Sequence, residues 1–180
     1  MTEKRGGQSN RRTSKKAALY GLFLALALVA SWLERLIPVS PGIPGVKMGL
    51  ANLVTMVLLY TVGLQAACAV TCARILLAGL LFGNAFSISY SFAGAILSMA
   101  VMVLLRKTGL FSVTGVSIAG GVFHNVGQIL VAMAVLGMSA LIYYLPFLII
   151  AGLAAGTLIG LVSGILIRRL SDVIRNVLAE

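Results

Sequence analysis

Acidic side chains are nearly missing from this chain. Glu3, Glu34, Asp172 and Glu180 are its only carboxylate residues, against fourteen Lys and Arg. No two of these acids are spaced to hold Mg²⁺ on a diphosphate, and the one Asp lies too near the C-terminus for a Ser–His–Asp arrangement. A nucleotide-binding P-loop of the form GxxxxGK[ST] is also missing. We therefore predict no catalytic residue, no bound cofactor and no enzymatic activity for the chain.

Cysteine is scarce as well. Cys68 and Cys72 are the only two, one helical turn apart in an apolar run. A metal site needs further ligands at suitable spacing, and none stands nearby. We therefore interpret both as small packing residues and expect no metal. The first apolar run is too long for a cleavable signal peptide and is not followed by a small-x-small site.

Charge of either sign makes up only 10% of the chain, whereas 60% of the residues are hydrophobic. This composition is typical of a multi-pass membrane protein in contact with the lipid bilayer. The net charge of +10 does not indicate nucleic-acid binding, because the basic residues cluster in the first sixteen positions and directly after apolar runs. Such clustering is the positive-inside bias of membrane proteins. We therefore expect a plasma-membrane location and no nucleic-acid partner.

The apolar runs predict an all-α membrane protein, a bundle of six transmembrane helices with both termini cytoplasmic. The chain divides into a basic cytoplasmic tail (1–16), the six-helix transmembrane domain (17–170) and a short cytoplasmic tail (171–180). The basic first tail is expected to be disordered or to lie on the membrane surface. The six helices are expected at 17–37, 48–62, 65–82, 87–105, 112–136 and 141–167.

One polar stretch interrupts the apolar runs. Gly121, His124, Asn125 and Gln128 are spaced i, i+3, i+4 and i+7, so they share one face of the fifth predicted helix. Polar side chains at bilayer depth are costly when they face lipid, so these must meet other helices, a ligand or water. His124, the only histidine, is either a satisfied core residue or part of a polar pocket.

Arg74 lies inside the third predicted helix, where an arginine costs about 2.5–3.5 kcal/mol on insertion scales. Either it forms an ion pair with Glu34, or it is the cation of an outward-facing pocket. Lys47 and Arg35 border a Pro- and Gly-rich loop at 38–45. They either snorkel to the interface or add to an electropositive outer vestibule.

Glycine and tyrosine form two further patterns. The sixth predicted helix repeats glycine at every fourth position from Gly152 to Gly164, which indicates close packing, inside the chain or against a partner along which it slides. Tyr90, Tyr143 and Tyr144 are expected in an aromatic belt rather than in pocket walls.

Three motifs together resemble the Gx transporter family, whose members are often labelled heptaprenyl diphosphate synthase component I. They are Lys47-Met48-Gly49-Leu50-Ala51-Asn52, the stretch from Arg74 to Asn84, and the stretch from Gly121 to Gln128. The family is similar to the substrate-binding S components of energy-coupling factor (ECF) transporters. That resemblance implies six helices, a first outer loop (38–46) capping an outward pocket, and a small-residue face on the first helix for a partner membrane subunit driven by two ATPases.

Carried over to this chain, the resemblance assigns the partner face to Ala17, Gly21 and Ala25. It assigns the substrate pocket to Lys47, Asn52, Arg74, His124, Asn125 and Gln128. We therefore expect a membrane substrate-binding subunit for uptake of a small anionic or amphipathic molecule through an ECF-type complex. The alternative is a non-catalytic membrane subunit of isoprenoid or quinone metabolism, and a third possibility is a stand-alone secondary carrier.

Overall fold

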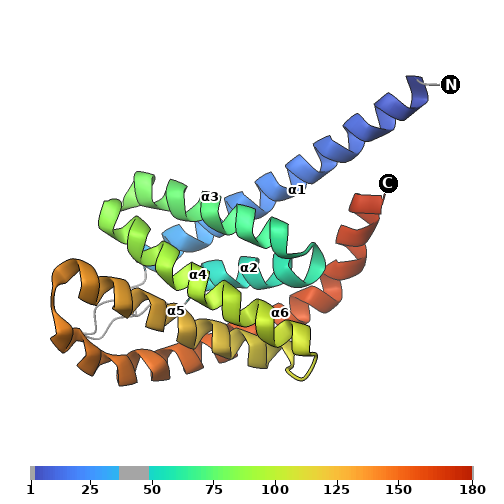
Figure 1. Ribbon diagram of the computed structural model, residues 1–180. Helices are drawn as coiled ribbons and strands as arrows, with labels where there is room; N and C mark the ends of the chain where they lie inside the picture. The colour runs from blue at the N-terminus through green and yellow to red at the C-terminus, as the bar shows by residue number, and fades with distance from the viewer. Residues whose placement is uncertain (1–2, 37–48, 180) are drawn as a thin grey trace.

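The computed structural model describes residues 3–36 and 49–179, which are helical with short connections and contain no strand (Figure 1). The elements are α1 (Glu3–Leu36), α2 (Leu50–Thr61), α3 (Leu64–Phe82), α4 (Ala85–Thr108), α5 (Val113–Leu136), the 3-10 segment η1 (Ser139–Tyr144) and α6 (Leu145–Ala179). The predicted all-α fold is thus confirmed for the described part of the chain. The outer loop predicted at 38–46 and Lys47 lie outside the described residues.

Five of the helices are long and apolar enough to cross a membrane, namely α1, α3, α4, α5 and α6. The remaining helix, α2, has 12 residues and is about 18 Å long, shorter than the hydrocarbon core of about 30 Å. Seven of its residues are buried inside the protein. Because α2 is surrounded by other helices rather than by lipid, its length does not have to match the bilayer.

The helices run back and forth along one direction, and both termini lie at the same end of the bundle (Figure 1). Helix α5 packs against α4 on one side and against α6 on the other. Helix α2 contacts α1, α3 and α6. Helix α2 is thus in contact with helices from both halves of the chain.

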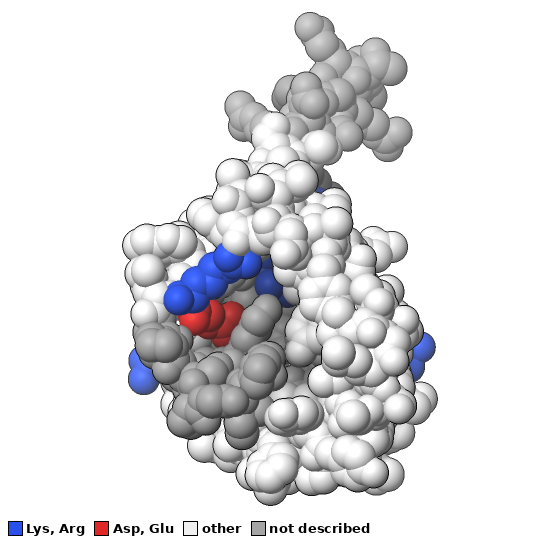
Figure 2. All heavy atoms as spheres, turned by 90° about the vertical axis from the view of Figure 1, so that its left-hand side faces the viewer, with Lys and Arg blue, Asp and Glu red and all other residues white. Residues whose placement is uncertain are grey.

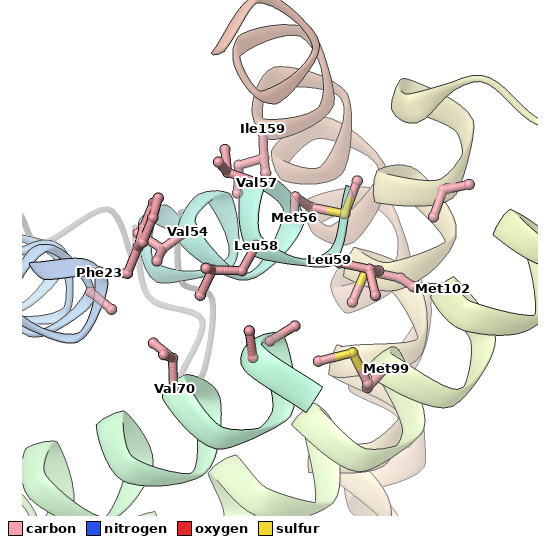
Figure 3. Packing of buried hydrophobic residues seen from close by; sticks show 14 of the residues in the cluster. Phe23, Val54, Met56, Val57, Leu58, Leu59, Val70, Met99, Met102 and Ile159 are labelled. Atoms are coloured by element: carbon pink, nitrogen blue, oxygen red, sulfur yellow. The ribbon is translucent and has the colours of Figure 1, made fainter. Parts of the chain in front are cut away.

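The core is built around α2, as Figure 3 shows. Met56, Val57, Leu58 and Leu59 are each at most 2% exposed. Apolar side chains from the surrounding helices pack against them, including Phe23, Val70, Met99, Met102 and Ile159.

The glycine repeat of α6 packs inside the chain. A Cβ added to Gly156 would lie only 2.7 Å from the Cα of Ile118 on α5. Added Cβ atoms at Gly152 and Gly160 would meet the backbone of α5 equally closely, at 2.9 Å and 2.6 Å. Gly164 has no such neighbour within 4 Å. The intramolecular interpretation is therefore correct for three of the four glycines.

Helix ends differ from the sequence prediction mainly at the two termini. Helix α1 begins at Glu3 rather than at 17, and α6 continues to Ala179, so both predicted tails are helical where described. In α6 the extension is amphipathic, since Ile174 is 5% exposed in the core cluster while Arg175 is exposed. An apolar face that finds a protein surface stabilises a helix beyond its membrane span.

Candidate functional site: a polar cavity shared by six helices

A polar cavity lies inside the bundle and receives residues from all six α-helices or their caps. It offers about 60 Å³ to the centres of water molecules. A single water needs about 10–15 Å³ on that scale, so the cavity has room for about four to six waters. Its polar lining residues are Glu34, Asn52, Arg74, Ser91, Ser98, Ser117, His124 and Asn125.

The cavity begins near the end of the bundle opposite the two termini, since its lining includes Glu34 in the last turn of α1 and Gly49 at the start of α2. Figure 2 looks onto this end and shows basic and acidic atoms together in a hollow. Glycine at position 49 suits the site, because its backbone has a φ of 76° and a Cβ there would meet Ile159 at 2.8 Å.

Four of the six predicted binding residues line this one cavity: Asn52 from α2, Arg74 from α3, and His124 and Asn125 from α5. Gln128 is buried on α5 but is not among the lining residues. Lys47 is outside the described part of the chain. The family resemblance, which assigned these residues to one pocket, thus named four side chains that the tertiary structure brings to one cavity from three separate helices.

Arg74 and Glu34 line the same cavity and carry opposite charges. Arg74 donates from Nη1 to the Ser31 hydroxyl at 3.4 Å, while its Nε is buried with no hydrogen-bond partner among the described residues. Glu34 accepts a hydrogen bond from the backbone N–H of Leu50 at the start of α2. Of the two alternatives from the sequence, the position of Arg74 in a pocket is observed, and its ion pair with Glu34 stays a prediction.

His124 owes its place to a glycine on the neighbouring helix. A Cβ added to Gly94 on α4 would lie 2.9 Å from Cε1 of His124 and 2.8 Å from Cγ of Gln128. The missing side chain at position 94 therefore makes the space that both side chains occupy. His124 reaches the cavity from this position, whereas Gln128 lies one turn further along α5, outside it.

Asn125 joins α5 to α6. Its Nδ2 donates to the backbone carbonyl of Leu148 at 2.6 Å. Hydrogen bonds of this kind between membrane helices contribute about 0.6 kcal/mol on average and up to about 1–2 kcal/mol. Asn125 thus fixes the spacing of two helices that border the cavity, in addition to lining it.

The sequence patterns do not assign Glu34 or the three serines to the binding pocket. Ser117 precedes Gly121 by four residues and His124 by seven, so it lies on the face already recognised on α5. Ser91 and Ser98 are likewise seven residues apart on α4. Serine is common in membrane helices as a packing residue, so this spacing alone did not separate cavity serines from others.

Arg35 lies close to the cavity but is held elsewhere. It donates to the carbonyl of Phe82 at the end of α3, and its guanidinium carbon lies 5.8 Å from the centre of the Phe82 ring. Arg35 therefore caps the C-terminus of α3, since basic side chains can donate to the last carbonyls of a helix, which lack an intrahelical partner. The snorkelling and vestibule interpretations of Arg35 both stay predictions.

Two of the predicted belt tyrosines line a second, mostly apolar crevice of about 400 Å³. Tyr90 on α4 and Tyr144 in η1 face it, together with Phe86 and Leu148. Tyr143 is 78% exposed and stays outside it. Within the described ranges, no three His, Cys, Asp or Glu side chains come together as metal ligands would.

Long apolar helices around a polar cavity define a multi-pass membrane protein. Residues 23–166 match the family described as heptaprenyl diphosphate synthase component I, so the chain belongs to that family. This result confirms the resemblance seen in the three sequence motifs. Comparisons with curated proteins and with solved structures gave no match.

Proposed function

We propose that the chain is a membrane-embedded substrate-binding subunit, similar to an ECF S component, that captures a small polar molecule for uptake. The observation that carries the proposal is the polar cavity, in which charged and hydrogen-bonding groups from separate helices converge. Burying such groups in a bundle is costly unless they are satisfied, and a ligand supplies partners for them. The buried Nε of Arg74, which has no partner among described residues, is the clearest such group.

The proposed orientation places both termini in the cytoplasm and gives the chain six membrane passes, with the short α2 as one of them. The orientation is supported by the C-terminal end of α4, which carries Arg106 and Lys107, and by the last part of α6, which carries Arg168 and Arg169, since both lie at the end of the bundle with the termini (Figure 1). The cavity then begins at the outer side of the plasma membrane. Reporter fusions test the orientation: a fluorescent protein at the C-terminus should fluoresce, and alkaline phosphatase there should be inactive.

The proposed contact with a partner membrane subunit lies on α1. Ala17, Gly21 and Ala25 are all exposed, and a Cβ added to Gly21 would have no neighbour within 4 Å. Small residues on an open helix face allow another helix to approach closely. In this proposal two ATPases drive the partner, and the chain itself has no catalytic role.

Native mass spectrometry tests the binding function. Full-length protein purified in mild detergent should carry a co-purified small molecule. Arg74→Ala and His124→Ala should lose that molecule while remaining folded, because each removes a polar group from the cavity wall. Arg169→Ala is the matched control, since Arg169 is exposed at the far end of the bundle. Retention of the ligand by both cavity variants would contradict the proposal, as would wild-type protein that binds nothing.

A second candidate function is a non-catalytic membrane subunit of isoprenoid or quinone metabolism. The description of the family favours it, and so does the apolar crevice of about 400 Å³ between α4, α5 and η1. That crevice suits a prenyl chain better than the small polar cavity does. Under this alternative, Ala132→Trp, which fills the crevice, should weaken binding of a prenyl diphosphate, whereas His124→Ala should not.

A further inference from the structure

The polar cavity and the apolar crevice are neighbours along the bundle. On α4, Tyr90 lines the crevice and the next residue, Ser91, lines the cavity. On α6, Leu148 lines the crevice and Gly152 lines the cavity, one helical turn or about 6 Å further along. The two spaces therefore adjoin one another, with the crevice nearer the end of the bundle that lies opposite the termini.

A side-chain hydrogen bond lies at the boundary between the two spaces. Asn125, which lines the cavity, donates to the backbone carbonyl of Leu148, which lines the crevice. Ile129, one turn beyond Asn125 on α5, already belongs to the crevice wall. Single hydrogen bonds of this kind between membrane helices are weak. Asn125 is thus the side chain that a ligand reaching from one space into the other would meet.

The two spaces offer complementary chemistry. In the cavity, Nε of Arg74 is a buried donor without a partner among the described residues, so it calls for an acceptor oxygen. Room for about four to six waters holds a small head group but no long chain. The crevice offers about 400 Å³, and none of its described lining residues carries a charge. Part of its wall is the stacked pair of Phe86 and Tyr90, whose ring centres lie 5.8 Å apart.

We propose that the cavity and the crevice form one site for an amphiphile, whose small head group brings acceptor oxygens to Arg74 while its apolar tail lies in the crevice. A medium-chain carboxylic acid has this chemistry. The inference rests on the proposed binding function and specifies its substrate class. Each space then receives the part of the ligand that it can satisfy, since the charged donor meets oxygen and the apolar wall meets hydrocarbon.

Three probes separate the head group from the tail. Octanoate has both, acetate lacks the tail, and octylamine replaces the acceptor oxygens by an ammonium group, which only donates. Binding to full-length protein in nanodiscs can be followed as a rise of the thermal unfolding midpoint with free probe concentration. Octanoate should bind at least about a hundredfold more tightly than acetate, because its tail leaves water. It should bind at least about tenfold more tightly than octylamine, which places a second cation near Arg74.

Two adjacent residues at the end of α5 provide matched variants. Leu136 is 53% exposed and lines the crevice, whereas Val135 is 61% exposed and is not among the lining residues. Leu136→Trp should weaken octanoate binding at least about tenfold, because the larger side chain takes up crevice volume, and Val135→Trp should leave it unchanged. A general effect of octanoate on the bilayer would be the same in both variants. Arg74→Ala should abolish octanoate binding.

Three results would overturn the amphiphile proposal: acetate binding as tightly as octanoate, equal octanoate affinity in Leu136→Trp and Val135→Trp, or octanoate binding that survives Arg74→Ala. The third would mean that the crevice holds only an acyl chain, as a bilayer lipid would supply. If Leu136→Trp does not fold, the ranking of the three probes on the wild-type protein still decides the question.

The co-purified molecule distinguishes this proposal from the binding function on which it rests. Wild-type protein that carries a co-purified molecule but responds to none of the three probes would overturn the amphiphile proposal alone. Wild-type protein that neither carries such a molecule nor responds to a probe would overturn the binding function as well.

Discussion

Gly121 on α5 and Gly152 on α6 bring their backbones into contact: a Cβ on Gly121 would lie 2.7 Å from the carbonyl oxygen of Gly152. This close approach brings α6 against the face of α5 that includes His124 and Asn125. Both glycines also line the polar cavity. The packing that holds the bundle together therefore also sets the width of the candidate site, and stability and binding are expected to respond together to substitutions here.

The glycine contacts predict contrasting effects along α6. Gly156→Ala should lower stability by about 1–3 kcal/mol, because the added methyl group would collide with the backbone of α5. Gly164→Ala should be neutral or stabilising by up to about 1 kcal/mol, since its Cβ has open space and alanine favours helix. Thermal unfolding of the two variants in the same detergent gives the comparison. Equal midpoints would show that α6 does not pack on α5 through Gly156.

Gly94 is expected to control access of His124 to the cavity. Gly94→Ala would press on the His124 ring and on its backbone carbonyl, each 2.9 Å from the new Cβ. We expect at least about a tenfold loss of affinity for the co-purified ligand, because a displacement of this size cannot be absorbed by the close-packed α4 and α5. Gly115→Ala is the control, since its nearest contact is at 3.6 Å. If Gly94→Ala and Gly115→Ala both bind the ligand with unchanged affinity, the position of His124 does not matter for binding.

Arg106 should stabilise the end of α2. It donates to the carbonyl of Leu59, and its guanidinium carbon lies 4.8 Å from the centre of the Tyr60 ring. Arg106→Lys keeps the charge but loses the planar fork, so we expect a loss of about 1 kcal/mol in unfolding free energy. The reciprocal change at its exposed neighbour, Lys107→Arg, should stay within about 0.5 kcal/mol. Thermal unfolding of the two variants in the same detergent gives the comparison. A midpoint temperature that falls equally in Arg106→Lys and Lys107→Arg would argue against a specific role for Arg106.

The exposed small face of α1 predicts a variant that separates binding from transport. Gly21→Leu should fold and bind its ligand as the wild type does, because position 21 has no neighbour within 4 Å. Uptake in cells that contain the partner subunits should be lost, since leucine prevents close helix approach. Ala154→Leu, at an exposed position of α6, provides the control. Normal uptake by Gly21→Leu would show that the partner subunit does not contact this face of α1.

The polar face of α5 shows what helical spacing in the sequence can predict and what it cannot. Spacing correctly placed His124, Asn125 and Gln128 on one side of one helix, yet the structure divides them. Asn125 bonds to α6, whereas Gln128 packs against α4. A face of a helix is wide enough to meet two neighbours, and spacing within one helix does not say where the boundary between them falls.

The length of α2 is a second such case. Hydropathy predicted a span over 48–62, and the helix observed has 12 residues. Window hydropathy detects apolar segments, but it does not distinguish a segment that faces lipid from one buried within protein. Helix α2 belongs to the second kind, with residues such as Leu58 and Leu59 fully buried.

By itself the sequence determined the membrane class, the approximate helices and the identity of the polar groups inside them. Those features depend on hydropathy, turn residues and charge within single segments. Tertiary structure alone decided that Glu34 and Arg74 meet in one cavity with His124, and that three serines complete its wall. Such convergence depends on contacts between helices far apart in the chain, and here glycines such as Gly94 and Gly121 set those contacts through close backbone packing.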